Sequence, residues 1–221
     1  MRGIFITGTD TDVGKTFVAT LLAKQLTANG LTIIPRKPIE SGCQRKNGEL
    51  LPADAIALKS AANYVGDLSK VCPYRFEPAL SPVRAASMDN QKITIEQLGD
   101  ACKYSTGDGF LLVEGAGGFY SPLAEDGLNA DLAEALQLPV LLVANDRLGC
   151  LNQILLTVEA ISNRGLKLAA VVLNNKQAEN DLAMNNAEDL SGHIRTPIYT
   201  IAYAQSNDAT LENLSQYLQT L

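Results

Sequence analysis

The chain has 221 residues, a length that fits one domain with a substantial buried core. Apolar residues make up 46% and charged residues 19%, which is ordinary for a soluble globular protein. The formal net charge is −6, and lysine and arginine form no block. Nucleic-acid binding, which needs a basic face, is therefore disfavoured.

Apolar runs such as Phe110–Val113 and Val140–Ala144 are far too short to cross a bilayer. The first residues enter a predicted strand without the long apolar region and cleavage site of a signal peptide. We therefore expect a cytoplasmic protein that does not bind a membrane.

The four cysteines are widely spaced and form no C-x-x-C pair, so we expect reduced thiols and neither a disulfide framework nor a metal site. They are Cys43, Cys72, Cys102 and Cys150. The one histidine, His193, follows Ser-Gly in a predicted turn and is expected at the surface. Catalysis must then depend on lysine, carboxylate, hydroxyl and backbone amide groups.

Short apolar runs alternate with longer amphipathic stretches along the chain. The runs predict strands at Gly3–Thr7, Thr32–Arg36, Phe110–Glu114, Val140–Ala144, Ala169–Leu173 and Ile198–Ile201. The stretches predict helices at Lys15–Ala28, Ala53–Ala62, Thr94–Lys103, Ala130–Leu136, Leu151–Asn163 and Ala209–Leu218. Several strands are apolar throughout, as strands covered on both faces must be.

This alternation predicts a single doubly wound α/β domain over residues 1–221, with a mostly parallel sheet and helices on both faces. Thr94 and Gln97 predict a capping box at the start of their helix. Gly30 and Gly165 follow helices at positions where a left-handed residue is expected.

A phosphate-binding loop is predicted between the first strand and the first helix, in the segment Gly8-Thr9-Asp10-Thr11-Asp12-Val13-Gly14-Lys15-Thr16. The strict pattern G-x-x-x-x-G-K-[ST] is missed, because its first glycine falls one residue early. Gly14 nevertheless allows close approach to a phosphate, Lys15 supplies a charge, and Thr16 supplies a hydroxyl to Mg²⁺. The alternative is a plain strand-to-helix turn.

Two carboxylates can complete a metal site. Glu114 follows an apolar strand, and the carboxyl ends of strands are where ligands bind in open α/β sheets. Its alternative is a solvated residue entering a turn. Asp54, in the first turn of a predicted helix, is by itself most simply a carboxylate favoured by the helix dipole.

The chain resembles dethiobiotin synthetase, a member of the deviant P-loop superfamily, over nearly its whole length. Besides the phosphate loop, the resemblance is carried by Lys37-Pro38-Ile39-Glu40-Ser41-Gly42, Asp54-Ala55, Ser81-Pro82, Glu114-Gly115-Ala116-Gly117-Gly118 and Leu148-Gly149-Cys150-Leu151-Asn152. It implies a ligase that uses ATP and Mg²⁺ to close a cyclic urea from 7,8-diaminopelargonic acid and CO₂ or bicarbonate, through a carbamate and a carbamic-phosphoric anhydride.

The resemblance also implies roles for individual residues. Lys15 and Lys37 are the catalytic cations, and Mg²⁺ is held by Thr16, Asp54 and Glu114. The residues expected at the nucleotide are Asp12, Val13, Gly14, Lys15, Thr16, Phe17, Asp54, Glu114, Gly115, Ala116, Gly117, Asn174, Asn175, Ala202, Tyr203 and Ala204. For Asn174 and Asn175 the alternative is a turn-forming pair. For Lys37 it is an exposed lysine at a strand end.

Thr11 and Ser41 match substrate contacts of the family. Gly149, Cys150, Leu151 and Asn152 match a helix start that holds the distal carboxylate of substrate bound to the other subunit of a homodimer. Three positions depart from the family pattern. Ala202 is often proline and Gln153 is often histidine, and Arg84 follows Ser81-Pro82-Val83 where a Ser-Pro-His sequence is usual.

Two other functions stay open. One is a nucleotide switch of the cell-division or partition type, which shares the loop but carries an additional lysine where this chain has Asp10. The other is a related ATP-dependent ligase that forms an amide. A pure binding module is less favoured, because a second lysine beside a phosphate site suits group transfer.

Overall fold

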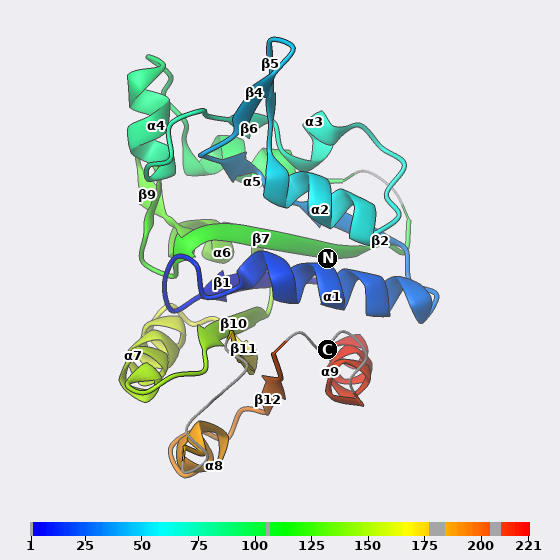
Figure 1. The fold of residues 1–221 in the computed structure, drawn as a ribbon, viewed down its shortest axis with the longest axis vertical. Helices are drawn as coiled ribbons and strands as arrows, with labels where there is room; N and C mark the ends of the chain where they lie inside the picture. The colour runs from blue at the N-terminus through cyan, green and yellow to red at the C-terminus, as the bar shows by residue number, and fades with distance from the viewer. Residues whose placement is uncertain (1, 105–106, 177–183, 204–208) are drawn as a thin grey trace.

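The computed structural model describes residues 2–104, 107–176, 184–203 and 209–221 (Figure 1). Within these residues, the central sheet has six strands in the order β12-β11-β10-β1-β7-β2, and every neighbouring pair is parallel. The strands are β1 (Gly3–Gly8), β2 (Ile33–Arg36), β7 (Phe110–Gly118), β10 (Val140–Asn145), β11 (Leu168–Asn174) and β12 (Ile198–Ile201). The predicted mostly parallel sheet is confirmed.

Helices cover both faces of the sheet, because successive apolar residues of the strands point to opposite faces and enter separate cores. On β1, Ile4 and Ile6 pack in the core under α1 (Lys15–Ala28), α2 (Ala53–Ala61) and α9 (Ala209–Gln219). Phe5 points to the other core, whose helices are α4 (Pro82–Met88), α5 (Ile95–Cys102), α6 (Asn129–Leu136), α7 (Cys150–Asn163) and α8 (Asn186–Ser191). The doubly wound architecture follows from this two-sided burial.

Several short elements were not predicted, because two to four residues carry no periodic signal. They include the parallel pair β3 (Ile39–Glu40) and β6 (Tyr74–Arg75), and the hairpins β4 (Gln44–Lys46) with β5 (Glu49–Leu51) and β8 (Pro122–Ala124) with β9 (Gly127–Leu128). The helix α3 (Leu68–Val71) belongs to the same group. Figure 1 shows β4, β5 and β6 beside α2 and α3, at the end of the sheet formed by β2.

The predicted end of one strand is wrong. β7 continues past Glu114 to Gly118, so Glu114 lies inside the strand. The ladder with β1 pairs Ile6 with Glu114 and then Gly8 with Gly118, which shows that β7 accommodates extra residues. The glycines of this segment, which have no side chain to accommodate, make the irregularity possible.

The predicted caps are confirmed: Thr94 and Gln97 form a capping box, and Gly30 and Gly165 have φ values of 86° and 66°. All four cysteines are unpaired and buried, and His193 is exposed. None of the helices that the structure describes is long and apolar enough to span a bilayer. The single domain over residues 1–221 stays a prediction.

We expect the first turn of α6 to contribute stability that depends on pH. Asp131 accepts a hydrogen bond from Leu128 N at 2.7 Å and pairs with Arg164 at 2.7 Å. Burial opposes ionisation of Asp131, but these two partners outweigh it and hold its pKa below the ordinary value of 3.8. Because the folded pKa is lowered, the stabilisation is present above pH 3.8 and is lost as pH falls through the lowered value.

Asp131→Ala should therefore lower the free energy of unfolding by about 1 kcal/mol at pH 7, the usual cost of losing a helix cap. The difference from wild type should shrink when urea unfolding is repeated below pH 3.8. Asp89→Ala, at an exposed residue, is the control and should unfold like wild type. An equal deficit at both pH values would show that the carboxylate charge of Asp131 contributes nothing.

Candidate active site

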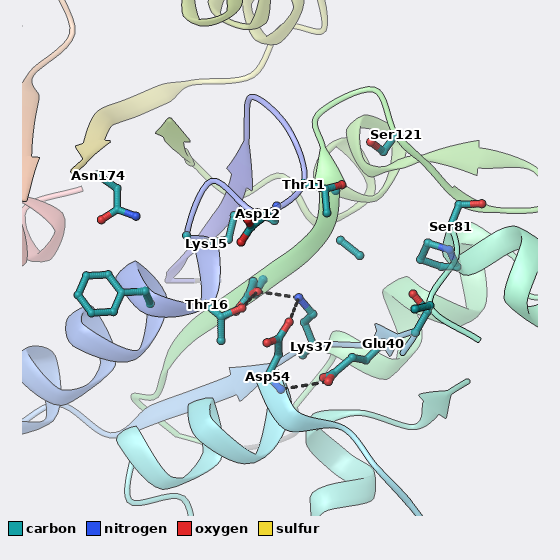
Figure 2. Close-up of a pocket in the computed structure, with 18 of the residues that line it drawn as sticks. Thr11, Asp12, Lys15, Thr16, Lys37, Glu40, Asp54, Ser81, Ser121 and Asn174 are labelled. Carbon is teal, nitrogen blue, oxygen red and sulfur yellow. Dashed lines mark hydrogen bonds and ion pairs between the residues drawn. The ribbon is translucent and has the colours of Figure 1, made fainter. Parts of the chain in front are cut away.

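A cavity of about 1000 Å³ opens at the carboxyl ends of β1, β2 and β7, where ligands bind in open α/β sheets. This volume is at the upper end of the range for small-molecule sites. Figure 2 shows the polar side chains that point into it from the loop before α1, from α2 and from the β3 segment. The lining includes Thr11, Asp12, Gly14, Lys15, Thr16, Phe17, Lys37, Glu40, Ser41, Asp54, Ser81, Glu114, Ala116, Gly117, Ser121, Asn174, Asn175, Lys176 and Tyr203.

The loop before α1 is folded tightly by two left-handed residues. Asp12 has φ 59° and Gly14 has φ 95°. Asn174, at the end of β11, donates from Nδ2 to the carbonyl oxygen of Val13 at 3.0 Å, and a Cβ on Gly14 would lie only 2.0 Å from the same nitrogen. The close approach of Asn174 therefore requires glycine at position 14.

Lys15 follows directly and is 7% exposed. Its ammonium donates to the carbonyl oxygen of Asp10 at 2.9 Å, which curls the side chain back over the loop. Burial, and then the nearby positive charge of Lys37, lower the pKa of Lys15 to about 8. An anion brought beside Lys15 would favour the charged form, so this lysine is suited to binding phosphate.

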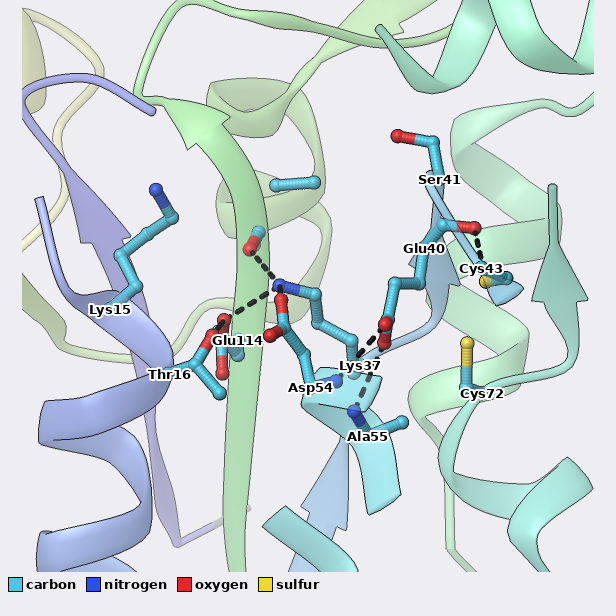
Figure 3. Close-up of polar contacts among 12 residues, drawn as sticks. Lys15, Thr16, Lys37, Glu40, Ser41, Cys43, Asp54, Ala55, Cys72 and Glu114 are labelled. Atoms are coloured by element: carbon cyan, nitrogen blue, oxygen red, sulfur yellow. Dashed lines mark hydrogen bonds and ion pairs between the residues drawn. The ribbon is translucent and has the colours of Figure 1, made fainter. Parts of the chain in front are cut away.

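Lys37 is almost fully buried between two carboxylates (Figure 3). Its ammonium lies 2.6 Å from Glu114 Oε1 and 3.2 Å from Asp54 Oδ2, and it donates to the carbonyl oxygen of Gly115 at 3.1 Å. Burial alone would lower the pKa of Lys37, but the charges of Glu114 and Asp54 outweigh burial and raise it. Lys37 is therefore a fixed cation.

The oxygen donors around Lys37 fit a divalent cation. Thr16 donates from Oγ1 to Glu114 Oε1 at 2.7 Å, which brings the hydroxyl and the carboxylate together. Glu114 Oε2 is buried and has no hydrogen-bond partner among the described residues. Asp54 keeps a side chain that is 41% exposed towards the cavity. Mg²⁺ prefers hydroxyl, carboxylate and water oxygens, so this donor set suits it.

Glu40 adds a third carboxylate, which the sequence analysis did not assign to the site. It is 6% exposed, and its two oxygens accept hydrogen bonds from Asp54 N and Ala55 N, each at 3.0 Å. Burial and the neighbouring Asp54 carboxylate raise the pKa of Glu40, while the two amides act in the opposite direction. Glu40 gave only a weak sequence signal, because its contact with the first turn of α2 depends on the tertiary fold.

The cavity has two ends, on opposite sides of Lys15 and Lys37 (Figure 2). One end is formed by Asn174, with Asn175, Lys176 and Tyr203 among the lining residues. Lys176, also not predicted, binds both the carbonyl and the carboxylate of Asp12, at 2.7 and 2.9 Å. The other end includes Ser41, Ser81 and Ser121.

Some predicted site residues lie elsewhere. In the part of the chain that the structure describes, the helix start at Gly149, Cys150, Leu151 and Asn152 does not line this cavity, and the thiol of Cys150 is buried. Val13 and Gly115 participate through their carbonyl oxygens, as described above.

Ala202 is half-buried outside the lining, and Ala204 lies outside the described residues. Of the other departures, Arg84 is exposed on α4, and Gln153 accepts a hydrogen bond from Arg147 at 3.2 Å.

Three comparisons place the chain among known proteins. A family model described as an AAA domain matches residues 2–202. The ATP-dependent dethiobiotin synthetase BioD of Ruthia magnifica subsp. Calyptogena magnifica is 41% identical over 212 residues, covering 96% of this chain and 95% of the relative. The enzyme of the same name from Vesicomyosocius okutanii subsp. Calyptogena okutanii is 45% identical over 174 residues, 79% of each chain.

Among solved structures, the septum site-determining protein MinD of Pyrococcus horikoshii, in complex with Mg-ADP, matches with a TM-score of 0.57 at 14% identity. The match covers 98% of this chain and 93% of that one and shows the fold alone. The fold, the phosphate-loop motif between β1 and α1 and the matching family model define a nucleotide-binding protein of the P-loop class. The identity and coverage of the relatives go further: the chain belongs to the dethiobiotin synthetase family.

We expect Gly14→Ala to impair nucleotide binding specifically. A left-handed alanine costs about 1–2 kcal/mol wherever it occurs, but at Gly14 the new methyl group would also displace Asn174. The matched control is Gly30→Ala, at φ 86°, where a Cβ meets none of the described atoms within 4 Å.

Titration with a fluorescent ADP analogue should show an affinity loss of roughly tenfold or more for Gly14→Ala, because the displaced Asn174 no longer holds the loop. A tenfold loss corresponds to about 1.4 kcal/mol of binding free energy. Gly30→Ala should bind like wild type and lose only thermal stability. Equal affinities in the two variants would exclude the close contact between Asn174 and the loop as a determinant of binding.

Proposed function

We propose that the chain carboxylates 7,8-diaminopelargonic acid and closes it to dethiobiotin, with ATP converted to ADP and phosphate. The observation that carries the proposal is the placement of two buried lysines, Lys15 and Lys37, beside a set of oxygen donors in one cavity. Membership of the family supplies the substrate class, because the relatives are named for this product.

The proposed reaction has three steps. One amine of the substrate adds to CO₂ and loses a proton, which gives a carbamate. A carbamate oxygen attacks the γ-phosphorus of ATP. The bond between the γ-phosphorus and the oxygen that bridges the β- and γ-phosphates breaks, and ADP is released. The second amine then attacks the carbonyl carbon of the mixed anhydride and loses a proton. The bond between that carbon and the phosphate oxygen breaks, and the ring closes as phosphate leaves.

Lys15 and Lys37 suit the second step because negative charge from the carbamate and the phosphoryl group converges there. Cations held in position before the reaction stabilise such charge most when water is excluded. Lys37 is fixed by Glu114 and Asp54 and stays protonated, since their charges raise its pKa. Lys15 lies at the start of α1, where the helix dipole also favours phosphate.

We propose that Thr16, Asp54 and Glu114 hold Mg²⁺. The ion would neutralise the phosphate oxygens of ATP when bound. At one end of the cavity, Asn174, Asn175 and Tyr203 are proposed to contact adenine; at the other, Ser41 is proposed to contact the substrate. Thr11 also lines the cavity and takes the same role.

The family resemblance assigns the distal carboxylate of the substrate to the start of α7, which is not among the described residues that line the cavity of its own chain. We propose that the α7 start at Gly149–Asn152 contributes this carboxylate site from the second subunit of a homodimer. Near it, Leu148 and Leu156 are 86% and 60% exposed, which favours an apolar contact between subunits. The amides at this helix start suit a carboxylate.

The reaction is tested by its dependence on both co-substrates. ADP release should be slow with ATP alone and reach full rate only with the diamine and bicarbonate, because the charges between Lys15 and Lys37 converge only in the complete complex. Mass analysis of the product should show the diamine with one carbonyl gained and two hydrogens lost. ATP hydrolysis that is equally fast without the diamine would favour the nucleotide switch.

Lys37→Gln keeps a polar side chain of similar length but removes the charge. Turnover should fall on the order of a hundredfold or more, the usual cost of one oriented transition-state donor, with a smaller change in ATP affinity. Lys92→Gln is the control, at a lysine whose side chain is 79% exposed, and should turn over like wild type. A Lys37→Gln variant that is folded by circular dichroism and fully active would remove Lys37 from the mechanism.

The homodimer is tested with Leu156→Glu. A charge in an apolar subunit contact should dissociate the dimer in sedimentation velocity and abolish turnover, because the carboxylate site then lacks one wall. Val65→Glu, at a fully exposed valine after α2, is the matched control and should stay dimeric. A fully active wild-type monomer would contradict the shared site, whatever the behaviour of the variants.

A further inference from the structure

The first turn of α2 lacks a capping side chain of its own. The residue before the helix is Pro52, whose side chain carries no hydrogen-bond acceptor. Asp54 and Ala55 are the second and third residues of α2, and amides at these positions have no partner within a helix. The polar residues preferred at the position of Pro52 satisfy one of these amides with a side-chain oxygen.

Glu40 supplies both missing acceptors from a distant segment. Its Oε1 accepts from Asp54 N and its Oε2 from Ala55 N, each at 3.0 Å (Figure 3). A carboxylate at this place also gains from the positive end of the helix dipole. Because Glu40 is 6% exposed, water competes poorly for these hydrogen bonds.

The backbone of Glu40 is itself fixed. Its carbonyl oxygen accepts from Phe76 N at 2.9 Å, as part of the pairing between β3 and β6. Three residues earlier, Lys37 donates from its backbone to Val71 O at 2.8 Å and contacts the carboxylate of Asp54 with its ammonium. One short segment therefore holds Asp54 twice, by its amide and by its side chain.

We propose that Glu40 is a positioning residue of the cation site, which fixes Asp54 opposite Glu114 by capping α2 from another segment. The inference rests on the metal site of the proposed function and extends it to a residue that lines the cavity. Without Glu40, one buried and one partly buried amide lose their partners, and the first turn of α2 can unwind and carry Asp54 away. Partners of metal ligands typically change metal affinity by about 10–100-fold when they are removed.

The test measures Mn²⁺ binding by electron paramagnetic resonance in the presence of ADP, so that no turnover is needed. Glu40→Ala should weaken Mn²⁺ binding by roughly tenfold or more, as expected for an outer partner of a metal ligand. Glu40→Gln keeps one acceptor and faces an N–H towards the second amide, so its affinity should fall in between. At saturating Mg²⁺, turnover of Glu40→Ala should recover, because Glu40 acts through Asp54.

Thr94→Ala is the matched control. It removes the cap of α5, which lies outside the cavity lining, and should lower thermal stability without changing Mn²⁺ affinity. Wild-type Mn²⁺ affinity in a less stable Glu40→Ala would overturn the proposal and leave Glu40 a purely structural cap. If Glu40→Ala does not fold, unchanged affinity in Glu40→Gln overturns it in the same way.

Asp54→Asn separates this inference from the metal assignment on which it rests. Weak Mn²⁺ binding by Asp54→Asn together with wild-type binding by Glu40→Ala overturns the role of Glu40 alone. Wild-type binding by Asp54→Asn overturns the metal assignment of Asp54 and with it the positioning role. Weak binding by both Asp54→Asn and Glu40→Ala, with Thr94→Ala unchanged, supports the proposal.

Discussion

The ion pairs of Lys37 with Glu114 and Asp54 are the interaction on which the cavity depends. Taking charges out of water costs several kcal/mol per ion, and the cost is offset only where partners are close and well placed. Here the ammonium of Lys37 has two carboxylates and one carbonyl within 3.2 Å. Those partners belong to β7 and α2. The ion pairs of one lysine therefore fix the position of α2 relative to β7.

This arrangement also gives the two lysines different characters. Lys37 is held protonated by its carboxylates, whereas Lys15 has a carbonyl partner and feels the repulsion of Lys37, and its pKa is lowered to about 8. Lys15 therefore gains most from an incoming anion, because an anion both replaces lost hydration and restores its charge. We infer that Lys15 responds to the phosphate chain, while Lys37 supplies a constant charge at the place where a second anion must approach.

The sheet was predictable because its strands are continuous apolar runs, and the loop at Gly14 because only a few residue types suit a phosphate. Other features needed the folded chain. β7 extends past Glu114 through a run of glycines, whose low strand propensity hides a ladder imposed by β1. Glu40 caps a helix that begins only at Ala53, and local patterns describe only caps supplied by neighbours in sequence. The contribution proposed for α7 would come from a second subunit, whose position one sequence does not give.

The phosphate loop and the end of the cavity formed by Asn174 are mechanically connected. Asn174 binds the carbonyl oxygen of Val13, and Lys176 binds the carbonyl and carboxylate of Asp12. The end of β11 thus fixes the backbone that leads into Gly14. A substitution at Asn174 would loosen the loop and so weaken the binding of ATP and of inorganic triphosphate alike. It would weaken ATP further only through the adenine contact proposed for Asn174. Loss of ATP affinity in such a variant is therefore insufficient to assign base recognition. Only a loss for ATP that exceeds the loss for triphosphate separates the adenine contact from the support that Asn174 gives to the loop.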